Sequence, residues 1–169
     1  MIAPMWRNKY FWVPFYLFIL AIVGVNFRSR FLPFLLFAVL TITVADTISS
    51  KVIKPTVKRD RPCRAEHLAE PAVVLISCGG GYSFTSSHAT NHFAIACFFM
   101  LTIGGIFTYS RILFLLWAAS ISYGQIYVGV HYPLDVLVGA LIGSLIGCSV
   151  AYLFNRRWRF ALENFDPIV

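Results

Sequence analysis

The sequence predicts an all-α fold: a polytopic transmembrane helical bundle formed by a single domain over residues 1–169. Hydrophobic residues make up 59% of the chain and charged residues 12%, and the mean hydropathy is +0.74. Soluble domains carry about 25% charged residues and fewer apolar ones. One core of this size cannot hide so much apolar surface from water. The composition therefore excludes a soluble globular enzyme, a disordered chain and a small disulfide-stapled scaffold.

Five apolar stretches have the length that a membrane-spanning helix requires, about 17 to 25 residues. They cover residues 10–26, 31–53, 86–107, 112–130 and 134–154. Trp12 and Trp158 lie near span ends, as is typical of a membrane interface. Residues 1–9 are expected to form at most an interfacial helix. No cleavable signal peptide is expected, because no small-x-small site follows the first stretch.

The last apolar stretch carries a face of small residues. Gly139, Gly143 and Gly147 recur every four residues, so they share one side of a helix. Such a face lets a neighbouring helix approach closely. Packing explains this pattern without any ligand.

The charge of the chain is unevenly placed. Fourteen Lys and Arg against seven Asp and Glu give a net charge of +7. In an apolar chain this excess is typical of residues that flank membrane helices, and we expect no nucleic-acid partner. Six of the cations nevertheless crowd into residues 51–64, more than anchoring requires. With these six set aside, the positive-inside rule places the C-terminus in the cytoplasm and the long loop 54–85 on the opposite face.

Alternating spans bring three polar segments to the face that carries the long loop. They are residues 54–62, 82–88 and 124–135. Lys and Arg donors suit phosphate, and backbone N–H groups at a helix start attract anions. His131 lies four residues before Asp135, which can orient the imidazole, while His88 offers a second imidazole for proton transfer. The set predicts metal-free phosphoryl transfer.

These segments resemble the signature of the type 2 phosphatidic acid phosphatases, membrane lipid phosphatases that share a fold with vanadium haloperoxidases. The first family motif, Lys-x6-Arg-Pro, is complete from Lys54 to Pro62. The second, Pro-Ser-Gly-His, corresponds to Thr-Ser-Ser-His at 85–88. The third, Ser-Arg-x5-His-x3-Asp, corresponds to residues 124–135, with Gly-Gln in place of Ser-Arg. The resemblance covers about half of the chain.

The resemblance implies a vanadium haloperoxidase-like core that needs no cofactor and no metal. It implies that His131 is the nucleophile, that Asp135 orients it, and that His88 is the general acid. It further implies a set of phosphate-binding residues: Lys54, Arg61, Ser86 and Ser87.

One position departs from the family in a way that matters for charge. Gln125 stands where the family has a phosphate-binding Arg, and a neutral amide cannot replace a guanidinium. Either Lys58, Arg59 or Arg64 supplies the missing cation, or the site tolerates weaker phosphate binding. These three residues and Gln125 are therefore further candidate substrate contacts.

Several polar residues keep two interpretations. Asp46 lies inside the second span, and it either serves the site or pairs with Ser49, Ser50 or a cation. His92 favours a packing role, because the Glu of a His-Glu-x-x-His zinc motif is missing. Cys63 and Cys78 share the long loop, and they form a disulfide only if that loop faces an oxidising compartment.

The expected function is hydrolysis of a lipid phosphomonoester or pyrophosphate at the periplasmic face of a bacterial inner membrane. Resemblance to short bacterial members suggests lipid A 1-phosphate, undecaprenyl pyrophosphate or phosphatidylglycerophosphate as substrate. The alternatives are a lipid-to-lipid phosphotransferase, a non-catalytic lipid-phosphate-binding membrane protein and a zinc-dependent intramembrane hydrolase. The sequence predicts neither the headgroup nor the oligomeric state.

Overall fold

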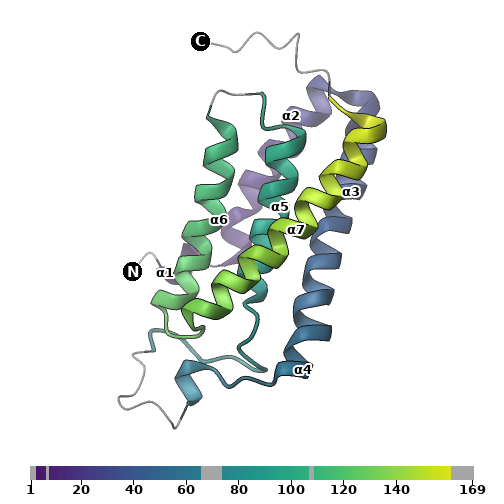
Figure 1. Ribbon diagram of the computed structural model, residues 1–169. Coiled ribbons are helices and arrows are strands. Elements are labelled where there is room, and N and C mark those ends of the chain that lie inside the picture. Colours follow the sequence, from purple (N-terminus) through teal and green to yellow (C-terminus); the bar gives the residue numbers. More distant parts are fainter. Residues whose placement is uncertain (1–2, 7, 66–73, 107–108, 161–169) are drawn as a thin grey trace.

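The computed structural model describes residues 3–6, 8–65, 74–106 and 109–160, and within them the chain is helical without strands (Figure 1). The α-helices are α1 (Ala3–Trp6), α2 (Val13–Asn26), α3 (Arg28–Asp46), α4 (Lys54–Val57), α5 (Ser87–Thr102), α6 (Ser110–Tyr127) and α7 (Pro133–Trp158). Short 3-10 helices cover Lys9–Trp12 and Pro62–Arg64, and a π-helix covers Thr47–Ile53. The all-α prediction is confirmed for these residues.

Each of the five predicted spans overlaps one of the long helices, and two segments are long and apolar enough to cross a membrane. By length and apolar composition these are the helical run Arg28–Arg64 and Pro133–Trp158; Tyr10–Asn26 is a shorter apolar helix. The five-span prediction is therefore confirmed in part. Helix α5, which corresponds to the third predicted span, ends at Thr102, earlier than predicted. The chain turns at Gly104 and Gly105, and glycine disfavours continuation of a helix.

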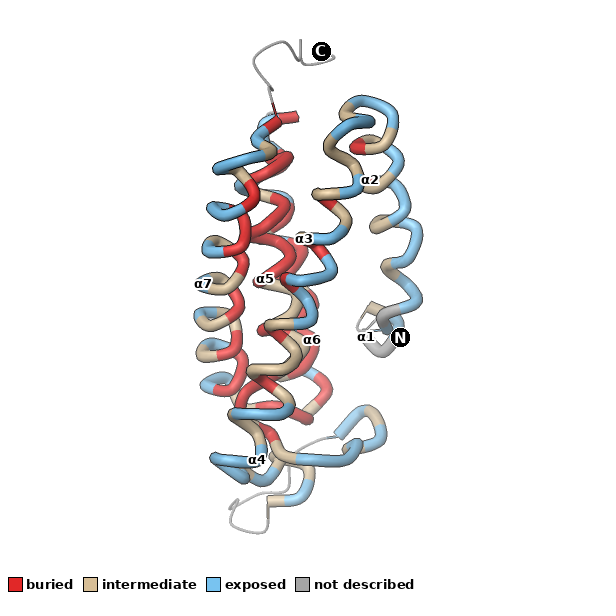
Figure 2. The backbone as a smooth tube through the Cα atoms, turned by 90° about the vertical axis from the view of Figure 1, so that its right-hand side faces the viewer, coloured by how far each residue is buried: buried red, intermediate tan, exposed pale blue. Residues whose placement is uncertain are grey.

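Helix α5 lies at the centre of the bundle and packs against α3, α6 and α7. Figure 2 shows its buried residues in red, together with the inward face of α7. Phe34, Phe98 and Phe154 come from three different helices and are completely buried against one another. On the outward face of α7, Leu137, Leu141 and Leu145 are exposed. A stripe of exposed leucine on a long apolar helix is typical of a lipid-facing surface.

The predicted small face of α7 lies against α5. A side chain at Gly143 would collide with the carbonyl oxygen of Thr90, and one at Gly147 with that of Ala94. The two backbones approach so closely that only glycine fits at these positions. This close packing holds the first turns of α5 and α7 beside each other.

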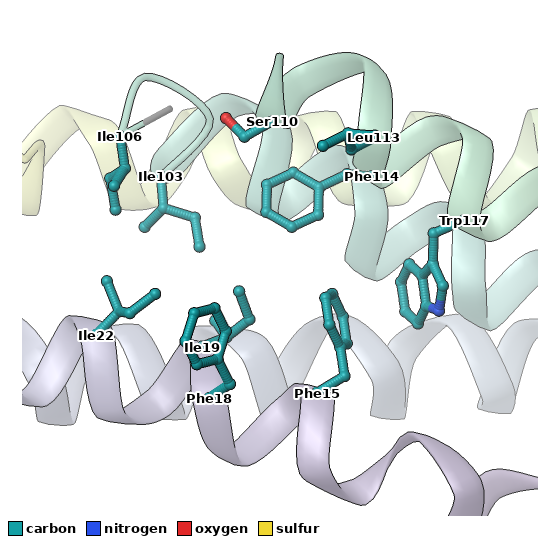
Figure 3. A pocket seen from close by; sticks show the side chains of 10 residues that line it. All are labelled: Phe15, Phe18, Ile19, Ile22, Ile103, Ile106, Ser110, Leu113, Phe114 and Trp117. Atoms are coloured by element: carbon teal, nitrogen blue, oxygen red, sulfur yellow. The ribbon is translucent and has the colours of Figure 1, made fainter. Parts of the chain in front are cut away.

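The N-terminal segment packs onto α6 through its aromatic residues. The indole of Trp6 donates a hydrogen bond of 3.0 Å to the Ser120 hydroxyl. Between α2 and the α5–α6 end of the bundle lies an apolar cavity of about 300 Å³ (Figure 3). Phe15 and Ile19 of α2 line it on one side, and Phe114 and Trp117 of α6 on the other.

The two ends of the bundle differ in what they carry. Helix α4, the first turns of α5 and α7 and the last turn of α6 lie together at one end (Figure 1). The opposite end carries arginines, and there Arg30 donates a hydrogen bond to the Arg159 carbonyl oxygen. The three segments predicted to converge therefore share one end of the fold.

Candidate active site

A pocket of about 370 Å³ lies where the ends of α5, α6 and α7 meet the π-helix and the segments that follow α4. Six residues predicted from the motifs line it: Lys54, Arg61, Ser87, His88, Gln125 and His131. Ser50, Ser77, Cys78, Gly79 and Gly80 complete its wall. No carboxylate is among these lining residues in the described part of the chain. The pocket is therefore suited to an anion.

His131 and Asp135 form a buried pair at the turn between α6 and α7. Asp135 lies in the first turn of α7 and is fully buried, and its Oδ2 is 3.6 Å from Nδ1 of His131. The same carboxylate accepts a hydrogen bond from the Tyr132 backbone N–H at 2.9 Å and another from the Ser83 hydroxyl. These donors hold the Asp135 carboxylate in one position. The His131 imidazole therefore always has the same acidic neighbour.

Arg59 neutralises the buried carboxylate. Its guanidinium donates to Oδ1 of Asp135 at 2.9 Å and lies 3.9 Å above the centre of the Tyr132 ring. The Arg59 carbonyl oxygen also accepts from the Ser83 N–H at 2.7 Å. Arg59 was expected among the substrate contacts, but the structure places it on Asp135 and outside the pocket lining.

Three further cations, Lys54, Arg61 and Arg64, bind carbonyl oxygens of the chain that follows them. Lys54 Nζ donates to the Tyr82 carbonyl oxygen at 2.8 Å while lining the pocket. Arg61 donates to the Gly80 and Gly81 carbonyl oxygens at 3.1 and 3.3 Å. Arg64 donates to those of Gly79 and Gly81, both at 2.9 Å. The two arginines thus hold residues 79–81 in place as one wall of the pocket.

The glycine wall has two further features. Gly79 and Gly81 have φ values of +67° and +72°, which side chains other than glycine rarely adopt. Cys63 and Cys78 form a disulfide, with Cα atoms 5.9 Å apart, and Cys78 lines the pocket. This disulfide, which the sequence left open, ties the segment after Arg61 to the wall.

Ser86 and Ser87 begin α5 but take different parts. Ser86 is the buried N-cap; its N–H donates to the Asp135 carbonyl oxygen at 3.0 Å, and it does not line the pocket. Ser87 lines the pocket, and its hydroxyl bonds the hydroxyls of Ser49 and Ser50, each at 3.0 Å. The π-helix presents both serines to Ser87, as such wider turns often do at functional sites.

Asp46 anchors this group of hydroxyls. Its Oδ1 accepts from Ser50 at 3.1 Å and from the Asn91 side chain at 3.2 Å. Of the two interpretations of Asp46, the structure shows the pairing with Ser50. Ser50 lines the pocket, and Asp46 does not. Lys58, exposed and with a φ of +52°, is not among the pocket-lining residues.

Burial sets the charge of His131. It lowers the pKa of this imidazole below its usual value, and the nearby charges of Lys54 and Arg61 act in the same direction. The Asp135 carboxylate opposes this shift without overcoming it. His131 is therefore neutral at pH 7, the form in which an imidazole nitrogen has a free electron pair.

Sequence reasoning found most of the pocket but missed residues behind it. Ser83, which donates to Asp135, and Ser50, which lines the wall, belong to no motif quoted above. The role of Arg59 was equally hidden, because it lies 76 residues from its partner. A signal for Ser83 existed in its place within the segment 82–88, where a hydroxyl precedes the second motif.

A family model described as the PAP2 superfamily matches residues 34–159, a range that contains every residue lining the pocket. The chain belongs to the PAP2 superfamily. The family inferred from the three motifs is confirmed, as is the prediction that the chain is a phosphatase.

Three relatives extend this finding. The chain is 37% identical to a lipid A 4′-phosphatase of Bacteroides thetaiotaomicron, over 98% of the chain and 77% of the relative. It is 31% identical to a lipid A 4′-phosphatase of Porphyromonas gingivalis, over 70% of the chain and 51% of the relative. It is 30% identical to an undecaprenyl-diphosphatase of Sulfolobus acidocaldarius, over 82% of the chain and 61% of the relative. No solved structure matches the chain, so the vanadium haloperoxidase-like core remains a prediction.

Proposed function

We propose that this PAP2-superfamily phosphatase hydrolyses a phosphate monoester of a membrane lipid through a phosphohistidine formed on His131. The observation that supports this most directly is the convergence in one pocket of two imidazoles, Lys54 and Arg61. One imidazole is buried and neutral beside a carboxylate, which is the arrangement expected of an activated nitrogen nucleophile.

The proposed reaction has two displacement steps. In the first, Nε2 of His131 forms a bond to phosphorus while the bond from phosphorus to the lipid oxygen breaks. His88, as an imidazolium, gives its proton to the departing lipid oxygen. In the second step, a water molecule attacks the phosphohistidine, His88 takes a proton from it, and inorganic phosphate leaves His131 free again. Asp135 holds the imidazole and stabilises the positive charge that it gains in the first step.

Lys54, Arg61 and the first turn of α5 supply the charge stabilisation in this proposal. Both side chains line the pocket, and both bring a positive charge to it while they bind carbonyl oxygens of residues 80–83. The backbone N–H of Ser87 lies at the helix N-terminus, where an anion is favoured. We propose that these groups stabilise the charge on the phosphoryl group without a metal ion, so that the reaction resists chelators.

The proposed setting is a bilayer crossed by all five long helices, with the pocket at the periplasmic face of the inner membrane. The exposed leucines of α7 and its apolar length support membrane insertion. The Cys63–Cys78 disulfide supports an oxidising compartment on the pocket side. The pocket would then meet a lipid headgroup at the membrane surface.

We propose lipid A as the substrate lipid, at its 4′-phosphate. Two of the relatives are named lipid A 4′-phosphatases, which favours this position over the 1-phosphate expected from the sequence. The relative named an undecaprenyl-diphosphatase makes the pyrophosphate of that lipid the second candidate. In that reaction the departing group is a lipid phosphate instead of a sugar hydroxyl.

The test is phosphate release by the purified protein from a panel of lipids. The panel contains bisphosphorylated lipid A, lipid A with only the 1-phosphate or only the 4′-phosphate, undecaprenyl diphosphate and phosphatidylglycerophosphate. We expect release from both lipid A forms that carry the 4′-phosphate, with mass spectrometry showing retention of the 1-phosphate, and unchanged rates in EDTA. Phosphate release from undecaprenyl diphosphate alone would make that lipid the substrate in place of lipid A. Loss of activity in EDTA would refute the metal-free mechanism. Binding of the lipids without any phosphate release would indicate a non-catalytic protein.

A further inference from the structure

The side chain of Gln125 is an unusual feature of the pocket. It lies in the last turns of α6, lines the pocket and has no exposed surface. Neither its amide nitrogen nor its amide oxygen has a hydrogen-bond partner among the described residues. Buried amides are nearly always bonded, because an unpaired donor or acceptor costs free energy. Both amide atoms are therefore available to a ligand that enters the pocket.

The groups that surround Gln125 narrow the ligand chemistry. Lys54 comes from the start of α4, Arg61 from the segment after it, His88 from α5 and His131 from the turn before α7. Behind this lining, Asp135 is paired with Arg59 and faces His131, and Asp46 is bonded to Ser50. All titratable groups that line the pocket are cations or imidazoles, so the ligand is an anion. The amide oxygen of Gln125, however, cannot bind an anionic oxygen, since both are acceptors.

We propose that Gln125 makes the pocket select a phosphoryl group that still carries one proton. The amide nitrogen would donate to an ionised oxygen of the phosphoryl group, and the amide oxygen would accept from its P–OH group. A fully ionised phosphate monoester lacks that donor and sets lone pairs against the amide oxygen. This inference rests on the proposed use of the pocket for a phosphoryl group, and it names the protonation state that the pocket binds.

Two small anions separate the proton from charge and shape. At pH 6 methylphosphonate is a monoanion with one P–OH, and methanesulfonate is a monoanion of the same shape with none. Their P–C and S–C bonds resist hydrolysis, so the protein can be studied without turnover. Protonation of His88 or His131 changes the binding of both anions alike, and the ratio of the two affinities therefore reports on the missing donor.

The experiment is calorimetric titration of the purified full chain in detergent with each anion at pH 6. We expect methylphosphonate to bind about tenfold more tightly than methanesulfonate, since one buried acceptor is satisfied only by the former. Toward pH 9 methylphosphonate becomes a dianion and no longer matches methanesulfonate in charge, so the two anions are compared at pH 6 alone. Equal affinities at pH 6, or binding of neither anion, would each overturn the inference.

Two variants place the effect on Gln125. Gln125→Met keeps the length of the side chain and removes both amide atoms, so the preference at pH 6 is expected to fall to within about twofold. Gln125→Arg adds donors but no acceptor, so at pH 6 the preference for the anion that carries a P–OH group is expected to disappear as well. A Gln125→Met protein that keeps the preference would overturn the inference. If the wild-type protein releases phosphate from none of the lipids, the proposed function is refuted instead. The wild-type ratio is informative even where a variant fails to fold.

Discussion

Two cavities of similar size lie at different places in this bundle and have opposite chemistry. The pocket at the α4 end, about 370 Å³, is lined by two cations, two imidazoles and a buried amide. The cavity between α2 and α6, about 300 Å³, is lined by aromatic and branched aliphatic side chains, with Ser110 as its one hydroxyl residue. That hydroxyl already donates to the Gly104 carbonyl oxygen. The contrast teaches that size does not single out a candidate reaction site, whereas the convergence of charged and polar groups does.

The difference follows from where each cavity lies along the helices. The polar pocket forms at helix ends, where the chain leaves regular structure and backbone groups and loop side chains are brought together. The apolar cavity lies between the flank of α2 and the α5–α6 turn with the adjoining part of α6, and mostly apolar side chains face it (Figure 3). Two histidines one turn apart on α5 mark the boundary. His88 lines the polar pocket, while the His92 ring lies 5.3 Å from Trp117 of the apolar cavity.

This pair of histidines gives the largest expected contrast. Replacing His88 with Asn removes the proposed general acid, and we expect kcat to fall about a hundredfold to ten-thousandfold. His92→Asn is the matched control one turn away, and we expect its kcat to stay within about threefold of wild type. The measurement is steady-state phosphate release from the same lipid. A comparable loss in both variants would show that α5 packing, and not proton transfer, explains the effect.

Substitutions of Arg59 test whether its ion pair with Asp135 is needed by the polar pocket. Arg59→Ala leaves the buried Asp135 carboxylate without its cation, and we expect kcat to fall about tenfold to a hundredfold with little change in KM. Arg59→Lys restores the charge without the planar fork, so partial recovery is expected. If KM rises while kcat holds, Arg59 contacts the substrate instead of positioning Asp135.

The disulfide tests whether the glycine wall must be held. Cys63→Ser with Cys78→Ser frees residues 78–81 from the segment after Arg61, and we expect KM to rise about threefold to tenfold at similar kcat. Reduction of the wild-type protein should reproduce this shift. The double variant in reductant is the control, because it should show no further change. A KM that stays at its wild-type value would show that the arginine contacts hold the wall alone.

The apolar cavity is expected to matter for stability and not for turnover. Phe114→Ala enlarges the cavity and removes ring contacts with Phe15 and Phe99, which should cost about 3 to 5 kcal/mol of stability. The melting temperature in detergent is expected to fall, while kcat at a permissive temperature stays within about twofold. A loss of kcat in fully folded Phe114→Ala protein would erase the distinction between the two cavities.

The pH dependence gives the smallest effect. Because burial lowers the pKa of His131, the neutral nucleophile persists to a pH below the usual imidazole value of about 6.5. On the acid side, activity is therefore lost only as pH falls below that value, and the acid limb of kcat/KM should lie there. A profile of kcat/KM from pH 4.5 to 8 measures it. An acid limb above pH 7 would mean that the essential base is not this buried imidazole.

Much of the fold was predictable because it depends on local patterns. Apolar length predicted the five helices, and the four-residue glycine spacing predicted that another helix approaches this face of α7 closely, which the structure shows to be α5. Motif spacing also predicted that Lys54, His88 and His131 would meet, since alternating helices bring their segments to one end. These features need only periodicity and chain order.

The remaining features depend on the path of irregular chain, which carries no such pattern. Arg59 reaches Asp135 only because the segments before Arg61 and around Ser83 run side by side, joined by a backbone hydrogen bond. The π-helix that turns Ser49 and Ser50 toward Ser87 has no sequence signature. The unsatisfied state of Gln125 is likewise visible only once its neighbours are placed.

The most direct test of the account is to locate the phosphoryl group on the protein during turnover. The purified enzyme is mixed with lipid phosphate labelled with ³²P, quenched rapidly in alkali, digested and mapped by mass spectrometry. We expect a base-stable, acid-labile label on His131, absent from His131→Asn, which also releases phosphate at least about a thousandfold more slowly. Label on another residue, or phosphate release by His131→Asn at the wild-type rate, would contradict the account.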